Sequence, residues 1–159
     1  MAQSDLIILT FTEREEAGWA RRALEMMREQ HGFGLEYALE ITRDRGGKTH
    51  LHQRIELPAY PYPPDRRLPT LLSAVIFSAS GEDHVRRLAN TGLDEFFLRR
   101  VTQALVPNSS ALLMFVPEDD ALVDLRALLD ALSRLKGTLH RTSVPEGIEQ
   151  SLIYHVRIS

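Results

Sequence analysis

Apolar residues follow three patterns along this chain, and each pattern predicts a kind of element. Two segments are almost wholly apolar, residues 5–11 and 110–116, which is typical of strands buried on both faces of a sheet. A less apolar segment, residues 138–144, predicts one more strand. Apolar residues at helical spacing predict helices that begin near residues 12, 71, 91 and 119, with a short last helix after Pro145.

The first predicted helix carries two apolar faces. A capping box at residues 12–15 predicts its start, and His31-Gly32 predicts its end. One apolar stripe consists of Ala17, Ala20, Leu24 and Met27. Trp19 lies off that stripe, beside Ala23 and Met26. We therefore expect this helix to bury a second surface.

Residues 36–57 alternate between apolar and polar side chains, which predicts a β-hairpin. A loop of residues 45–47 places Ile41 opposite Leu51, so that the apolar faces of the two strands coincide. A two-residue loop would place apolar residues opposite polar ones, which a half-buried hairpin does not tolerate. Gly47 suits the left-handed position that a three-residue hairpin loop needs.

The element order is strand, helix, strand, strand, an excursion with helices, strand, helix, strand. It predicts an α+β fold, a ferredoxin-like split β-α-β sandwich with an extra hairpin strand and an inserted helical middle segment. Residues 1–159 are expected to form a single domain. Residues 57–91 form the excursion, which is proline-rich at first and then contains the short apolar helix. Strands apolar on both faces need cover on both, so we expect the middle helices or a second copy of the chain to supply one side.

Composition excludes several classes of protein. A hydrophobic content of 43% with 26% charged residues is that of a globular chain. Because there are no cysteines, disulfides, thiolate zinc sites and cysteine nucleophiles are ruled out. The net charge of −3 gives no general attraction to nucleic acid. No apolar segment approaches the ~20 residues of a transmembrane helix, and the N-terminus does not resemble a secretory signal, so we expect a cytoplasmic protein.

The polar face of the hairpin carries one candidate site. His50 and His52 are two residues apart on a strand and share a face, and the predicted register places Glu40 opposite His52. Two imidazoles and a carboxylate are a partial ligand set for zinc or another divalent ion. A solvated sheet face explains the same residues and is the favoured interpretation. No catalytic residue and no cofactor site are predicted elsewhere.

Six segments together carry a family resemblance: DLIILTF at 5–11, DRGGK at 44–48, LHQ at 51–53, GLDEFF at 92–97, ALVPNSSAL at 104–112 and HRTSV at 140–144. The chain resembles an uncharacterised bacterial domain family whose members are often described as predicted membrane proteins. The family's glycine-rich hydrophobic centre is replaced here by the proline-rich residues 57–69. Its Pro-Gly-Ser turn is Pro107-Asn108-Ser109 here, and asparagine tolerates the same left-handed backbone. The family has no established activity, so the resemblance bears on the fold and not on function.

Three functions follow from these observations. The favoured prediction is a non-enzymatic, self-associating interaction module, with a dimer as the expected state, because no catalytic constellation is present. The alternative from another class is a metal-binding protein or metal-dependent enzyme that uses His50, His52 and Glu40. A second alternative is peripheral membrane attachment through residues 68–79, which could also be core or a dimer interface.

Overall fold

The computed structural model describes residues 4–31, 38–53, 72, 75–77, 81–116, 125–145, 147–148 and 150–153. The strands are β1 (Ser4–Phe11), β2 (Ala38–Arg43), β3 (Thr49–Gln53), β4 (Ser110–Val116) and β5 (Thr138–Val144). The helices are α1 (Glu16–His31), α3 (Glu82–Ala89), α4 (Glu95–Ala104) and α5 (Leu125–Ser133). The expected mixed α+β architecture is confirmed. Among the described helices, none is long and apolar enough to cross a membrane.

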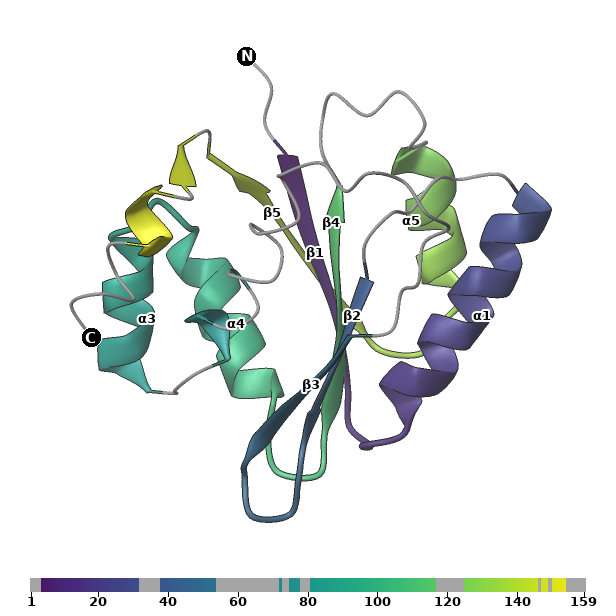
Figure 1. Ribbon diagram of the computed structural model, residues 1–159, viewed down its shortest axis with the longest axis horizontal. Coiled ribbons are helices and arrows are strands. Elements are labelled where there is room, and N and C mark those ends of the chain that lie inside the picture. Colours follow the sequence, from purple (N-terminus) through teal and green to yellow (C-terminus); the bar gives the residue numbers. More distant parts are fainter. Residues whose placement is uncertain are drawn as a thin grey trace.

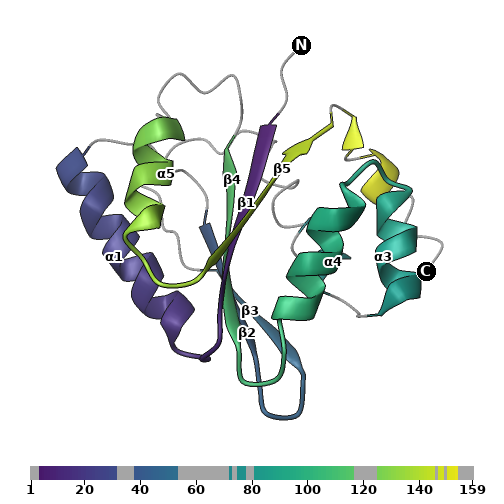
Figure 2. The ribbon, with the colours of Figure 1, turned by 180° about the vertical axis from the view of Figure 1, so that it is seen from behind.

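The strands form one antiparallel sheet in the order β3-β2-β4-β1-β5. Both β1 and β2 pair antiparallel with β4, so they run parallel to each other with β4 between them. In the same way, β4 and β5 run parallel with β1 between them. Helices α1 and α5 lie together on one side of the sheet, and α3 and α4 lie on the other (Figures 1 and 2). Each of the two strand-helix-strand units therefore leaves room for a strand of the other unit.

The core consists of two apolar clusters, one on each face of the sheet. Leu6 and Ile8 of β1 belong to the cluster under α3 and α4, whereas Ile7 and Leu9 belong to the cluster under α1 and α5. All seven residues of β4 are buried. The prediction that the two most apolar segments are strands buried on both faces is confirmed.

The middle of the chain covers its own sheet. Leu72, Val75, Ile76 and Phe77 are buried in the cluster on the α3 and α4 side, and Leu72, Val75 and Ile76 have helical backbone as predicted. Helix α3 was not predicted, because its charged ends, Glu82-Asp83 and Arg86-Arg87, obscure a helix of only eight residues. With these segments in place, the second face of the sheet is covered without another copy of the chain.

The hairpin has the predicted register, with Ile41 opposite Leu51. Gly47 has the expected positive φ of 86° in the loop. The carbonyl of Asp44 accepts hydrogen bonds from the backbone N–H groups of Gly47, at 3.0 Å, and of Asn108, at 3.3 Å. Asn108 has a φ of 64°, so the left-handed backbone expected at this turn is also confirmed. These bonds join the hairpin loop to the turn that precedes β4.

Helix α1 starts later than predicted and is capped from a distant strand. The capping box at residues 12–15 is wrong, because the carboxylate of Glu16 accepts the Glu13 N–H at 3.1 Å and the helix begins at Glu16. Ser110 of β4 supplies the cap: its hydroxyl accepts the N–H of Ala17 at 3.1 Å and donates to the carbonyl of Glu13 at 2.6 Å. One buried hydroxyl thus joins the first turn of α1 to the sheet.

The remaining helix and strand predictions divide into two groups. Asp94 caps α4 by accepting the N–H of Phe97 at 3.1 Å, close to the predicted start, and β5 has its predicted bounds. Residues after Pro145 include a short helical stretch, as expected. The proline-rich residues 57–69, the helix start near residue 119 and the outer ends of the hairpin strands lie outside the described residues.

Candidate interaction surface

Glu40, one of the residues predicted as metal ligands, lies on the side of the sheet that faces α1. The register places Glu40 opposite His52, as predicted. Glu40 is not on a solvated face: its carboxylate accepts a hydrogen bond from Nε of Arg21 at 3.1 Å, and that arginine is largely buried. A methyl group added at Gly18 would lie only 3.3 Å from the same carboxylate. Glu40 therefore supports the packing of α1 on β2, and the solvated-face interpretation is wrong for this residue.

His50 is paired with the hairpin loop. Its Nε2 lies 3.0 Å from Oδ2 of Asp44, and Asp44 also accepts the backbone N–H of Lys48 at 2.9 Å. The hydrogen bond with His50 has the larger effect and the bond from Lys48 the smaller, and both lower the pKa of Asp44 below its ordinary value. The side chain of His52 lies outside the described part of the chain. Among the described residues, no three metal-binding side chains come together, so the metal site stays a prediction.

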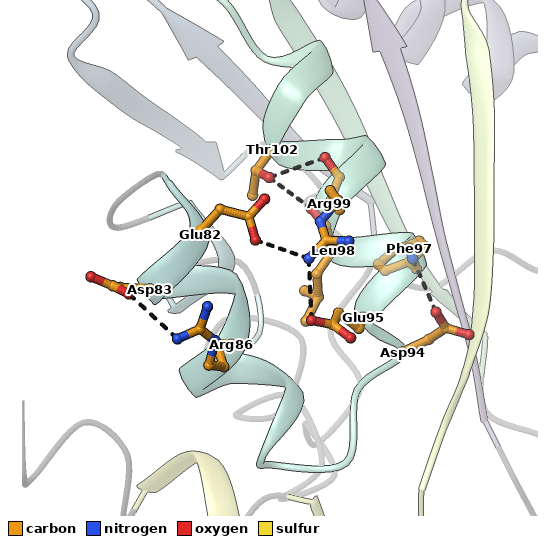
Figure 3. Close-up of polar contacts among 9 residues, drawn as sticks. All are labelled: Glu82, Asp83, Arg86, Asp94, Glu95, Phe97, Leu98, Arg99 and Thr102. Carbon is orange, nitrogen blue, oxygen red and sulfur yellow. Dashed lines mark hydrogen bonds and ion pairs between the residues drawn. The ribbon is translucent and has the colours of Figure 1, made fainter.

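Charged groups between α3 and α4 join the two helices. Arg99 of α4 lies 2.9 Å from the carboxylate of Glu82 on α3 and 3.2 Å from that of Glu95 on its own helix (Figure 3). The outer pair, Arg86 and Asp83, is longer at 3.9 Å and exposed. Exposed pairs of this kind contribute little to stability, typically about 0–1 kcal/mol each. Of these pairs, only the Arg99–Glu82 pair joins the two helices, and the other pairs each lie within one helix.

Two histidines are buried with partners inside the chain. Nε2 of His140 on β5 lies 3.0 Å from the hydroxyl of Thr10 on β1. Burial, together with the nearby charge of Arg100, lowers the pKa of His140. Nε2 of His84 lies 3.1 Å from the carbonyl of Ile76. Both histidines are held by packing and hydrogen bonds, so their roles are structural.

Five large apolar side chains among the described residues are exposed on the surface. On α1, the inward stripe is buried, while Trp19 is 57% exposed and Met26 is also exposed on the outward face. The second apolar face of this helix exists, but it is not buried within the chain. On β5, Leu139 is 46% exposed. The other large exposed hydrophobic residues among the described ones are Phe96 on α4 and Val106 after it.

Strand β5 is an edge strand of the sheet. It pairs with β1 on one side, and its other side has no backbone partner among the described residues. From behind, β5 is the nearest strand and lies between α5 and α4 (Figure 2). The charge of Arg141 is paired within the chain, since its Nε lies 3.3 Å from the carboxylate of Asp5. The mixture of polar and apolar residues at 138–144 predicted a strand, but it did not predict that this strand lies at the edge of the sheet.

Comparisons with protein-family models, with curated proteins and with solved structures found no match. The resemblance to the uncharacterised bacterial family therefore stays a prediction. Function has to be argued from the residues and surfaces of this chain alone.

Proposed function

We propose that this protein is a non-enzymatic interaction module that self-associates, and that β5 is the strand to which a second copy binds. The observation that carries the proposal is the open side of β5, with Leu139 exposed beside it. An edge strand presents a row of unpaired N–H and C=O groups, which is a template for another strand. The described charged clusters have partners within the chain and perform packing roles, which favours binding over catalysis.

Two features make β5 a better contact than an ordinary edge. Proteins commonly protect an edge strand with a charged side chain that repels a partner. The charge on this strand, Arg141, is offset by Asp5, so it gives weaker protection. Leu139 is a large apolar side chain that a partner would remove from water, and burial of a leucine stabilises by roughly 1.5–3 kcal/mol. Both features favour association over isolation of the edge.

The proposal includes the finer predictions about fold and location. The strand order and the two strand-helix-strand units, each with an inserted strand, support a ferredoxin-like split β-α-β arrangement with β3 added at one edge. We place the protein in the cytoplasm, as the cysteine-free composition suggests. The side chains that membrane attachment through residues 68–79 would need include Leu72 and Ile76, and both are fully buried.

Native mass spectrometry of the untreated protein over a range of concentrations tests this proposal. We expect the dimer mass to dominate at high concentration and the chain mass to increase on dilution. Trp19 is the single tryptophan and lies on α1, away from β5, so its emission maximum reports separately on the α1 face. Association through β5 leaves that emission unchanged. If only the mass of a single chain is observed at every concentration, self-association is refuted. If the Trp19 emission shifts to the blue on association, the contact lies on α1 and not on β5.

A further inference from the structure

We propose that His140 is a pH-sensitive switch: the neutral imidazole holds the edge strand β5 against β1 and α4, and its protonation loosens that strand. The proposal goes beyond the structural role of His140 and does not depend on self-association. His140 is 8% exposed, and its Nε2 lies 3.0 Å from the hydroxyl of Thr10 on β1. It lies opposite Ile8, on the side of the sheet that faces α4, and α4 packs against β5. One titratable side chain therefore lies where three elements meet.

The hydrogen bond to Thr10 can form in either protonation state of His140. The Thr10 hydroxyl donates to an unprotonated Nε2, or it accepts from a protonated Nε2 and donates to the carbonyl of Thr138, 3.5 Å away. A bond of that length is weak. The cost of protonation must therefore come mainly from the surroundings of the ring.

The surroundings of His140 oppose a second positive charge. Arg100 of α4 is close enough to act on the ionisation of the imidazole. Ile148 and Leu152, which follow β5 in the chain, add only apolar side chains to the cluster on this side of the sheet. The carboxylates described on β1 and α4 have other partners: Asp94 caps α4, Glu95 binds Arg99, and Asp5 binds Arg141. Within the described part of the chain, His140 therefore has no carboxylate to stabilise an imidazolium.

Protonation of His140 consequently favours an opened β5. Burial, and to a smaller extent the charge of Arg100, lower the pKa of His140 below the value of about 6.5 that an exposed histidine has. As pH falls below about 6.5, a state in which the ring has reached water takes up a proton before the closed state does. The equilibrium constant for opening then rises, by at most about tenfold per pH unit for one proton. We expect the opening at β5, because this strand carries the histidine and lies at the edge of the sheet.

Amide hydrogen exchange of the full-length protein between about pH 5.5 and 7.5 tests the switch. Each exchange rate, compared with the intrinsic rate at the same pH, gives a protection factor that reports on opening. We expect the protection factors of β5 to fall at least about twofold towards acid pH in the wild type. They should stay constant in a His140→Gln variant, because an amide can still bond to Thr10 but does not titrate.

His50→Gln is the matched control, since it makes the same change on β3 at the other edge of the sheet. This variant should keep the wild-type fall in β5. An equal fall in H140Q and the wild type, or no fall in the wild type, overturns the proposal.

A second measurement needs no substitution of the histidine. NMR titration of the wild-type imidazole should give His140 a pKa below that of a histidine in an unfolded peptide. An Arg100→Gln substitution, at an exposed residue, should raise that pKa. A wild-type value at or above the peptide value refutes the switch, even if H140Q does not fold. Both measurements concern a single chain, so failure of the switch leaves the proposed self-association untouched, and failure of self-association leaves the switch.

Discussion

Removal of one buried hydroxyl should show how strongly α1 depends on the sheet. Ser110 is fully buried, and its hydroxyl serves both Ala17 N–H and Glu13 carbonyl. A Ser110→Ala substitution leaves both backbone groups without that partner, and Ala17 is itself fully buried. An unsatisfied buried polar group costs about 1–3 kcal/mol, and loss of a helix N-cap costs about 1 kcal/mol. We expect the free energy of unfolding to fall by about 2–4 kcal/mol.

The assay is urea unfolding followed by Trp19 fluorescence, because Trp19 lies on α1 just after the capped turn. Ser109→Ala is the matched control. Ser109 is also buried, but its hydroxyl donates only to the carbonyl of Val106, which keeps the backbone N–H of Ser109 as a second donor. The control should lose less than about 1 kcal/mol. Equal losses for S110A and S109A, or a loss below about 0.5 kcal/mol for S110A, would show that the hydroxyl does not cap the helix.

Three further predictions concern stability. A Gly137→Ala substitution should lower the free energy of unfolding, measured by thermal unfolding, by more than about 3 kcal/mol, because φ is 120° and the new methyl would lie 2.8 Å from the Phe11 ring. A near-neutral result contradicts this packing. Glu40→Ala should cost about 1–3 kcal/mol in urea, because Arg21 loses one of its two carboxylates, and an unchanged midpoint would show that the pair is dispensable. Because the pKa of Asp44 is lowered in the folded protein, the unfolded chain takes up a proton first as pH falls below about 4, and the free energy of unfolding should decrease there. An Asp44→Asn substitution should flatten this dependence of stability on pH. An unchanged dependence contradicts the hydrogen bonds at this carboxylate.

Elements defined by neighbouring residues could be predicted from the sequence. The hairpin register followed from alternation and from Gly47, because a shift of one residue would have reversed the apolar face. The buried strands β1 and β4 followed from their uninterrupted apolar residues. In each case the pattern that stabilises the element is contained within the element itself. The hairpin register and the bounds of β4 therefore agree with the structure, and β1 begins one residue earlier than predicted, at Ser4.

Features that depend on distant residues could not be predicted. The cap of α1 comes from Ser110, which is 93 residues away from Ala17 in sequence. Glu40 was assigned to an exposed face because alternation marks a side chain as polar but does not say what lies above it. Only the position of α1, with Gly18 and Arg21 over β2, buries that carboxylate. The metal hypothesis depended on the same missing information.

The structure changes the reason for expecting self-association. From the sequence, one face of the doubly apolar strands was expected to be covered by the middle helices or by a second copy of the chain. That face is covered by α3, α4 and the buried residues Leu72, Val75, Ile76 and Phe77 of the chain itself. A sheet with both faces covered can still add a strand at an edge. The residues of β5 are mixed in polarity, unlike those of β1 and β4. Leu139 of β5 is exposed, whereas the leucines of β1 and β4 are buried. A partner should therefore be sought along β5 and not over the sheet.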